Sequence, residues 1–425
     1  MLYKSTEFTR RGYAPRIPSA LPATLPTPFG MVAPRLALVL KRLRVRCMVK
    51  SASALDGPLK FRVSSPYNQM ESAQWVATAT RDTEGGTLMN SEQARFQILA
   101  LSGGGYRGLY TAKILADLEQ EIGGPIARHF DLIAGTSIGG ILALAVAMEI
   151  PAEKMVNLFE EHGEDIFKRR FSLRGIIRAP YSQEPLKRLL SAPDIFGEQT
   201  LGACRHPVVV PAINYSTGQP QLFKTAHHAS FKRDHQFRLV DIALATSAAP
   251  GYFPRHTFNN NQYVDGGLYA NAPGLIALHE AQMFFGHPPD AVHMMSVGTM
   301  SSKFTADPRR NRSGGTYDWG GIHPANMPKR LFGVSISVQE SLSDFMLKHR
   351  LGARYVLVDD VLTDERARAV ALDKADAPAR EVLMGSASEK SKACLGRDDC
   401  QAFLRHQSAL PKFYYGPNAA REVQC

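Results

Sequence analysis

The sequence has few cysteines, and those it has form no framework. Its 425 residues include five, an odd number scattered along the chain: Cys47, Cys204, Cys394, Cys400 and Cys425. This pattern excludes a disulfide scaffold, and the spacing matches no zinc site. Cys394 and Cys400 are near enough to pair in an oxidising compartment, but we expect a reducing cytoplasm, which would keep them as thiols.

Long apolar runs are also missing. None approaches the roughly 18 residues of a membrane-spanning helix, and the longest, around 138–150, is expected to be a core helix. Because 44% of the residues are apolar, the chain can bury a large core. We therefore expect one domain of about 300 residues with appendages.

Acidic residues are nearly absent from the first 50 residues, which carry ten basic side chains and only Glu7. The net charge of the chain is +11, and this segment accounts for +9, so residues 51–425 carry only +2. The body is near neutral and shows no basic patch interleaved with aromatic residues. We expect no nucleic-acid partner.

The same N-terminal region is rich in proline between 15 and 34 and polar between 75 and 95. Such composition predicts a disordered extension over residues 1–92. Within it, 35–48 mixes apolar and basic residues and is compatible with a short helix on an anionic membrane surface. The alternative is that translation starts at Met89, which would remove this segment from the protein.

A glycine-rich turn at Gly135-Thr136-Ser137-Ile138-Gly139 has the G-x-S-x-G form of a nucleophile elbow. An apolar stretch at 130–134 precedes it and reads as a buried strand, and 138–149 reads as a buried helix. This strand, turn and helix setting makes Ser137 a candidate nucleophile. The competing interpretation of an isolated motif is a Gly/Ser turn that only caps the helix.

A second turn, Gly103-Gly104-Gly105-Tyr106-Arg107-Gly108, follows an expected strand at 96–101 and precedes an expected helix at about 108–120. Free N–H groups at a helix N-terminus favour an anion, so the turn could hold an oxyanion. It also satisfies the dinucleotide pattern G-x-G-x-x-G, which expects an acidic residue on the next strand. The next strand does carry Asp131, but this strand runs directly into the Ser137 turn. That arrangement disfavours the dinucleotide-binding interpretation. A phosphate loop is disfavoured because no Gly-Lys-Ser/Thr follows.

A serine nucleophile needs a base, usually a histidine held by a carboxylate. No histidine stands in an evident motif, and the late candidates are more typical of surface positions: His279, His287, His293, His323, His349 and His406. Asp265-Gly266-Gly267 stands out instead, an aspartate at an expected strand end. It is either a tight turn or a carboxylate that acts directly on the serine.

Together these segments resemble the patatin-like phospholipases. The two glycine turns, the stretch Ala245–Pro254 and Asp265-Gly266-Gly267 occur in that family's order, over about 96 to 300. The resemblance implies an α/β three-layer sandwich with a mostly parallel central sheet flanked by helices. It also implies a serine acyl hydrolase with a Ser-Asp dyad, Ser137 as nucleophile and Asp265 as proton acceptor. The oxyanion turn would be formed by Gly103, Gly104 and Gly105, with Arg107 beside them. The family's motifs are also matched by Gly108, Gly135, Gly139, Gly266 and Gly267. The resemblance implies no metal and no catalytic cofactor.

A narrower resemblance rests on Tyr181–Leu186 and Ser341–Arg350, which look like the CapV-type phospholipases of bacterial antiphage signalling. It implies activation by a cyclic dinucleotide such as cGAMP and cleavage of membrane glycerophospholipids. The enzyme would be cytoplasmic and act peripherally on the inner membrane, and it could assemble as a homo-oligomer. Candidate partners for the activator's phosphates are Lys168, Arg169, Arg170 and Arg174, or Arg309, Arg310 and Arg312.

The expected organisation is the extension 1–92, a phospholipase domain at 93–360 and a helical tail at 361–425 packed on it. Residues 151–200 are an insertion placed to form a cap over the active site. Three alternatives remain: a lipid acyl hydrolase without nucleotide control, a Ser-His-Asp esterase of small esters, and a nucleotide sensor without catalysis.

Overall fold

A computed structural model describes residues 95–170, 179–300, 314–315, 319, 327–362 and 369–419. All of them belong to one compact unit, Gly86–Cys425. The predicted extension, Met89 and the cluster Arg309–Arg312 lie outside the described residues. Among the helices in the described ranges, none is long and apolar enough to cross a membrane.

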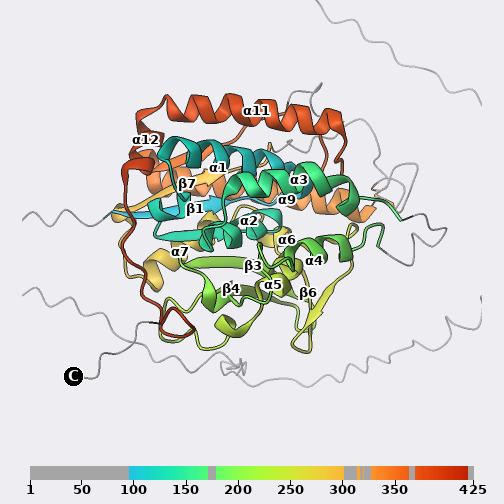
Figure 1. Ribbon diagram of the computed structural model, residues 1–425, viewed down its shortest axis with the longest axis horizontal. Coiled ribbons are helices and arrows are strands. Elements are labelled where there is room, and N and C mark those ends of the chain that lie inside the picture. The colour runs from blue at the N-terminus through green and yellow to red at the C-terminus, as the bar shows by residue number, and fades with distance from the viewer. Residues whose placement is uncertain are drawn as a thin grey trace, which may run out of the picture. The chain divides into compact units, whose positions relative to one another are not determined.

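A central sheet organises this unit (Figure 1), with strand order β5-β6-β3-β2-β1-β7-β8 and β4 paired to β3. The parallel strands are β1 (Phe96–Leu101), β2 (Leu132–Gly135), β3 (Val208–Asn214), β7 (Val292–Val297) and β8 (Tyr355–Val358). The antiparallel strands at one side are β4 (Gln219–Lys224), β5 (His256–Phe258) and β6 (Asn261–Asp265).

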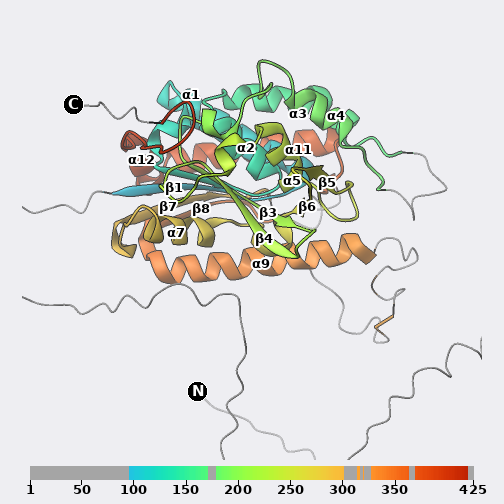
Figure 2. The same cartoon turned by 90° about the horizontal axis from the view of Figure 1, so that it is seen from below.

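Helices cover both faces of the sheet (Figure 2). One face carries α1 (Gly108–Ile122), α2 (Ile138–Ala147), α3 (Ala152–Ile166), α4 (Glu184–Leu190), α5 (Leu239–Thr246), α11 (Ala377–Leu395) and α12 (Asp398–Arg405); the other carries α7 (Gly274–Met283) and α9 (Met327–Leu351). The short α6 (Gly267–Ala270) follows β6. The predicted α/β fold, with a mostly parallel sheet between helices, is confirmed.

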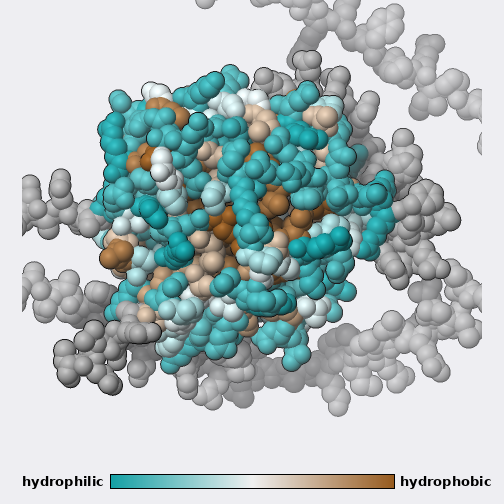
Figure 3. All heavy atoms as spheres, viewed as in Figure 1, coloured by the Kyte–Doolittle hydropathy of each residue, from teal (hydrophilic) through white to brown (hydrophobic). Residues whose placement is uncertain are grey.

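The side-chain alternation of β1 explains why both faces are covered. Leu99 and Leu101 are buried in the core shared with α1, α2 and α11, while Ile98 and Ala100 are buried in the core shared with α7 and α9. A strand buried on both faces reads as a continuous apolar run, which is how 96–101 appears in the sequence. Figure 3 shows hydrophobic residues gathered near the position of α2 on an otherwise mostly hydrophilic face.

Two sequence expectations need correction. The strand predicted at 130–134 begins only at Leu132, because Phe130 ends a short 3-10 helix and the Asp131 side chain is committed elsewhere. Its carboxylate accepts the Gln97 N–H (2.7 Å) and lies 3.1 Å from His406 Nε2. Asp131 lies beside the first residues of β1 and β2, whereas the Gly103 turn follows the last residue of β1. Asp131 is therefore at the wrong end of the sheet to bind the ribose of a dinucleotide held by that turn.

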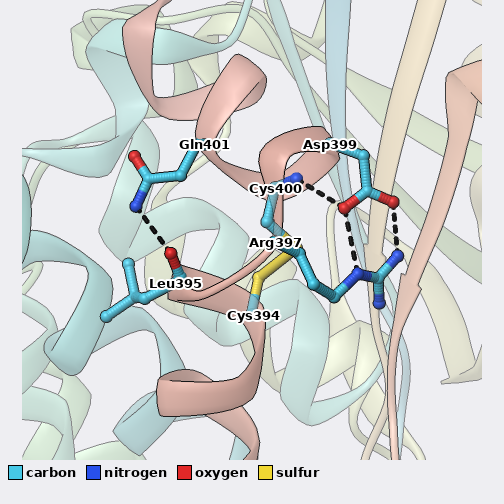
Figure 4. The surroundings of a disulfide bond; sticks show 6 residues. All are labelled: Cys394, Leu395, Arg397, Asp399, Cys400 and Gln401. Atoms are coloured by element: carbon cyan, nitrogen blue, oxygen red, sulfur yellow. Dashed lines mark hydrogen bonds and ion pairs between the residues drawn. A yellow bond between two sulfur atoms is a disulfide. The ribbon is translucent and has the colours of Figure 1, made fainter.

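The second correction concerns the cysteines, because Cys394 and Cys400 form a disulfide where free thiols were expected (Figure 4). Between α11 and α12 the chain turns so tightly that their Cα atoms are 5.6 Å apart. Arg397 pairs with Asp399 in this turn, and Gln401 Nε2 donates to the Leu395 carbonyl (2.8 Å). Cys204 is a buried free cysteine.

Candidate active site

Ser137 occupies a strained turn between β2 and α2. Its backbone has φ 56° and ψ −126°, a positive φ that non-glycine residues rarely adopt and that costs free energy. The Ser137 N–H donates to Thr246 Oγ1 (2.9 Å), and its carbonyl accepts the Gly140 and Ile141 N–H groups that start α2. A Cβ on Gly139 would collide with the backbone of β1, which explains the glycine after the elbow.

Asp265 lies directly beside this serine. Ser137 Oγ donates to Asp265 Oδ2 at 2.7 Å, and the Gly267 N–H donates to Asp265 Oδ1 at 2.7 Å. Asp265 ends β6 opposite Ala212 of β3, so the sheet fixes its position. The segment Gly266-Gly267 thus holds the carboxylate by a backbone donor rather than forming only a tight turn.

Burial controls the protonation of Asp265. Its side chain is fully buried, and this desolvation raises its pKa to about 7, although the Ser137 and Gly267 hydrogen bonds act in the opposite direction. A carboxyl group with a pKa near neutrality can both accept and return a proton at cellular pH. The pair therefore has the geometry and the proton affinity of a nucleophile and its base.

The glycine turn after β1 faces the same serine. The Gly103 N–H is already committed to the Asn271 carbonyl (3.0 Å), the Tyr106 N–H to the Leu372 carbonyl (2.9 Å) and the Arg107 N–H to the Gly104 carbonyl (3.2 Å). Within the described part of the chain, the N–H groups of Gly104 and Gly105 have no such backbone partner. The expected donor set of three glycines is thereby reduced to these two.

Arg107 does not face the site as expected. It is only 5% exposed, and its guanidinium donates to the carbonyl oxygens of Met300 (3.1 Å) and Gly104 (3.4 Å). Burial lowers the pKa of this guanidinium. Its hydrogen bonds hold the glycine turn against the Met300 backbone. Its contribution is to the shape of the turn rather than to contact with an oxyanion.

Sequence reasoning missed residues that hold the turn in place. Asn271 Nδ2 donates to the Gly103 carbonyl (3.0 Å) and to Glu340 Oε1 (2.6 Å), and Thr299 Oγ1 donates to the same carbonyl (3.0 Å). Asn271 stands six residues after Asp265 in a segment that already attracted notice. Thr299 and Glu340 carry no local motif, so nothing in the sequence marked them.

A pocket opens in front of the pair, lined by Gly104, Gly105, Ser137 and Asp265; we call it the serine pocket. Its remaining walls are almost entirely apolar: Ile138, Ile141, Phe159, Ile166, Phe167, Leu186, Ala249, Tyr252, Phe253, Phe332, Ile336 and Leu372, with Ser247 and Asn271. Four of these, Phe159, Ile166, Phe167 and Leu186, lie in the expected insertion 151–200. Such walls fit a hydrocarbon chain better than a polar substrate.

Histidine contributes nothing to the part of the serine pocket that the structure describes. His406 contacts Asp131 at the other end of the sheet, and His349 lies on α9 against Phe345. Within the described ranges, no group of three or more His, Cys, Asp or Glu side chains could hold a metal ion. These observations disfavour the Ser-His-Asp alternative.

The fold and the site define a class: an α/β protein with a nucleophile-elbow serine, an aspartate partner and a glycine turn at an apolar pocket. Residues 99–278 match the family model described as patatin-like phospholipase. A protein of Pseudomonas aeruginosa named cGAMP-activated phospholipase is 44% identical over 329 residues, covering 76% of this chain and 96% of that protein. The chain belongs to the patatin-like phospholipase family.

Two further similarities add detail. An Escherichia coli protein, also named cGAMP-activated phospholipase, is 34% identical over 67% of this chain and 85% of its own length. Among solved structures, VipD from Legionella pneumophila matches with 12% identity and a TM-score of 0.34, covering 70% of this chain and 67% of that one.

Proposed function

We propose that this protein is a phospholipase that cleaves acyl esters of membrane glycerophospholipids with Ser137 and Asp265, and that cGAMP switches it on. The observation that carries the chemistry is the 2.7 Å contact between Ser137 Oγ and Asp265 Oδ2 at the floor of an apolar pocket. The relatives named cGAMP-activated phospholipase support the substrate and the switch.

The reaction has two steps. Ser137 Oγ attacks the ester carbonyl carbon while Asp265 takes its proton, and the lysophospholipid oxygen leaves with that proton. Water then loses a proton to Asp265 as it attacks the acyl-serine carbonyl carbon. Ser137 Oγ leaves, takes that proton back from Asp265, and the fatty acid is released. The N–H groups of Gly104 and Gly105 bind the oxyanion in both steps, and Arg107 keeps the turn in shape.

The surroundings fit this role. Phe159 and Leu186 come from the insertion 151–200, which we propose acts as the cap over the acyl chain. We propose that the enzyme acts as a peripheral protein at the cytoplasmic side of the inner membrane, with a homo-oligomer as the candidate assembly. Cutting the cell's own lipids on a nucleotide signal is the chemistry expected of an antiphage defence enzyme.

Nucleotide control follows from the hazard of such an activity. An unregulated phospholipase would damage its own membrane, so the resting state must be nearly inactive. A ligand shifts this equilibrium only by its preference for the competent state. Moving from about 1% to 99% active requires about 5.5 kcal/mol of that preference.

The test is release of free fatty acid from vesicles of phosphatidylethanolamine and phosphatidylglycerol, with and without cGAMP. We expect release only with cGAMP, and none from Ser137→Ala. Ser247→Ala is a matched control, because its hydroxyl also lies at the serine pocket but donates to the Ala243 carbonyl (2.7 Å); it should keep most of the activity. Equal release with and without cGAMP would favour the lipid acyl hydrolase without nucleotide control.

A further inference from the structure

A second pocket lies beside the serine pocket and has the opposite character. Its lining includes Arg170, Tyr181, Arg255, Thr257 and Gln262, and we call it the arginine pocket. Polar surface dominates its walls, whereas apolar surface dominates those of the serine pocket. A pocket of this kind suits a charged ligand rather than an acyl chain.

The charge in the arginine pocket is unbalanced. Among the described residues no carboxylate lines it, and no ion pair joins Arg170 or Arg255 to another described side chain. A third pocket shows the contrast, because Glu119, Glu149 and Glu153 line it beside a single lysine. Two guanidinium groups at one concave surface, with no carboxylate partner among the described residues, favour a ligand with negative charge.

Arg255 is also positioned for such a ligand. Its guanidinium carbon lies 4.5 Å from the centre of the Tyr215 ring, and stacking on a ring leaves the N–H edge free to bind phosphate oxygens. Thr257 of β5 pairs in register with Gln262 of β6. A hydroxyl and an amide therefore stand side by side in the lining of the arginine pocket, and both can bind the polar edge of a base or a sugar.

From this arrangement we propose that the arginine pocket is the activator site and binds the phosphodiester groups of a cyclic dinucleotide. The inference rests on the proposed function, which supplies cGAMP as the ligand. Of the basic clusters considered from the sequence, it selects Arg170 and adds Arg255. Lys168 and Arg169 are neighbours of Arg170, and Arg174 lies outside the described residues.

The chain connects the two pockets directly, which gives the ligand a way to act. In the segment 252–255, Tyr252 and Phe253 line the serine pocket while Pro254 and Arg255 line the arginine pocket. The segment 167–170 does the same, with Phe167 in the first and Arg170 in the second. A ligand that draws Arg170 and Arg255 together would act on the same two segments that carry the aromatic walls in front of Ser137.

Tyr181 joins these two segments. Its N–H donates to the Tyr252 carbonyl (3.1 Å), and its ring stacks on Tyr252 with centroids 6.5 Å apart and contacts Phe167 at 5.8 Å. Its hydroxyl donates to Asp373 (2.7 Å), which also binds Lys329 at the start of α9 (2.6 Å). A shift at the arginine pocket can therefore reach three walls of the serine pocket through packed contacts: Phe167, Tyr252 and the start of α9.

The test compares Arg170→Ala and Arg255→Ala with Arg233→Ala. Arg233 is a matched control, because it too is an arginine over an aromatic ring, Phe237 at 5.6 Å, but it does not line the arginine pocket. Calorimetry measures cGAMP binding to each full-length protein, and fatty-acid release is titrated with cGAMP and, separately, with phospholipid vesicles. Thermal unfolding checks that each variant is folded.

We expect each pocket variant to weaken cGAMP binding by about 10- to 100-fold, the usual cost of a lost charge-assisted contact. The cGAMP concentration for half-maximal release should rise by the same factor, with an unchanged rate at saturation, and Arg233→Ala should match the parent protein. Wild-type-like cGAMP binding by both pocket variants would overturn the site but leave the proposed function standing. A raised KM for lipid with unchanged cGAMP affinity would assign the pocket to a phospholipid headgroup instead. Failure of the parent protein to bind cGAMP would overturn the nucleotide switch itself, and with it this site.

Discussion

Replacing Asp265 with asparagine should abolish acyl-ester cleavage and, at the same time, stabilise the protein above neutral pH. The reason is that a fully buried carboxylate is costly to ionise in the native state. Burial raises the Asp265 pKa from its ordinary value of 3.8 to about 7. At 1.36 kcal/mol for each pKa unit, the difference amounts to about 4 kcal/mol.

The sign follows from proton binding. Between about pH 4 and pH 7 the unfolded chain has lost the Asp265 proton while the native state retains it. The free energy of unfolding of the parent protein therefore falls across this window on account of this group. Below pH 4 both states are protonated and the group contributes nothing; above pH 7 the full loss is present.

Asparagine can take the place of Asp265 without losing its hydrogen bonds. Its oxygen can accept the Gly267 N–H, and its amide can donate to Ser137 Oγ, where Oδ1 and Oδ2 now accept. The variant therefore removes the ionisation cost and little else. Its advantage in unfolding free energy should grow from near zero at pH 4 toward an upper value of about 4 kcal/mol at pH 8.

Urea unfolding at pH 4.5, 6, 7 and 8 measures this difference. Ser137→Ala is the control, because it leaves the buried carboxylate in place and should show no such pH-dependent gain. A stability difference for Asp265→Asn that stays constant from pH 4.5 to pH 8 would refute the argument that burial raises this pKa.

The remaining predictions concern turnover. Ser137→Ala and Asp265→Ala should each abolish acyl release in a folded protein. The double variant should be little worse than either single variant, since the pair acts as a unit. Near-normal release by Asp265→Ala would exclude its role as base. Gly104→Ala places a methyl group against the Thr299 side chain. Turnover should therefore fall about 100- to 1000-fold, as for loss of one oxyanion donor, with little change in lipid binding. An unchanged rate would contradict the assignment of this turn as the oxyanion site. The initial rate with saturating cGAMP should rise as pH increases through about 7, the Asp265 pKa, whereas a profile flat from pH 5.5 to 8.5 would contradict it.

The sequence predicted the features whose signals are local. Ser137 was found because it lies in a glycine-flanked turn after an apolar strand, and Asp265 because it ends a strand before two glycines. The structure brings Ser137 Oγ to 2.7 Å from Asp265 Oδ2. Strand β1 has the predicted bounds, since an apolar run and the glycine turn after it mark them. The nucleophile role predicted for Ser137 and the base role predicted for Asp265 are tested by the experiments above.

Features that depend on distant contacts escaped prediction. The Gly103 N–H was expected to bind an oxyanion, but the Asn271 carbonyl, 168 residues away, accepts it. Arg107 looked like an anion ligand until its buried contact with the Met300 carbonyl was known. Arg170 and Arg255 share a pocket because backbone hydrogen bonds join their segments, from the Arg170 N–H to the Pro180 carbonyl and from the Tyr181 N–H to the Tyr252 carbonyl. No pattern in the sequence connects them.

The central claim is that Ser137 carries the acyl group during phospholipid cleavage. The most direct measurement is peptide mass spectrometry after the enzyme, cGAMP and phospholipid vesicles are mixed and quenched in acid within one turnover. We predict a fatty acyl adduct on the peptide that contains Ser137, formed only with cGAMP and missing from Ser137→Ala. An adduct on another residue, or full fatty-acid release by Ser137→Ala, would contradict the account.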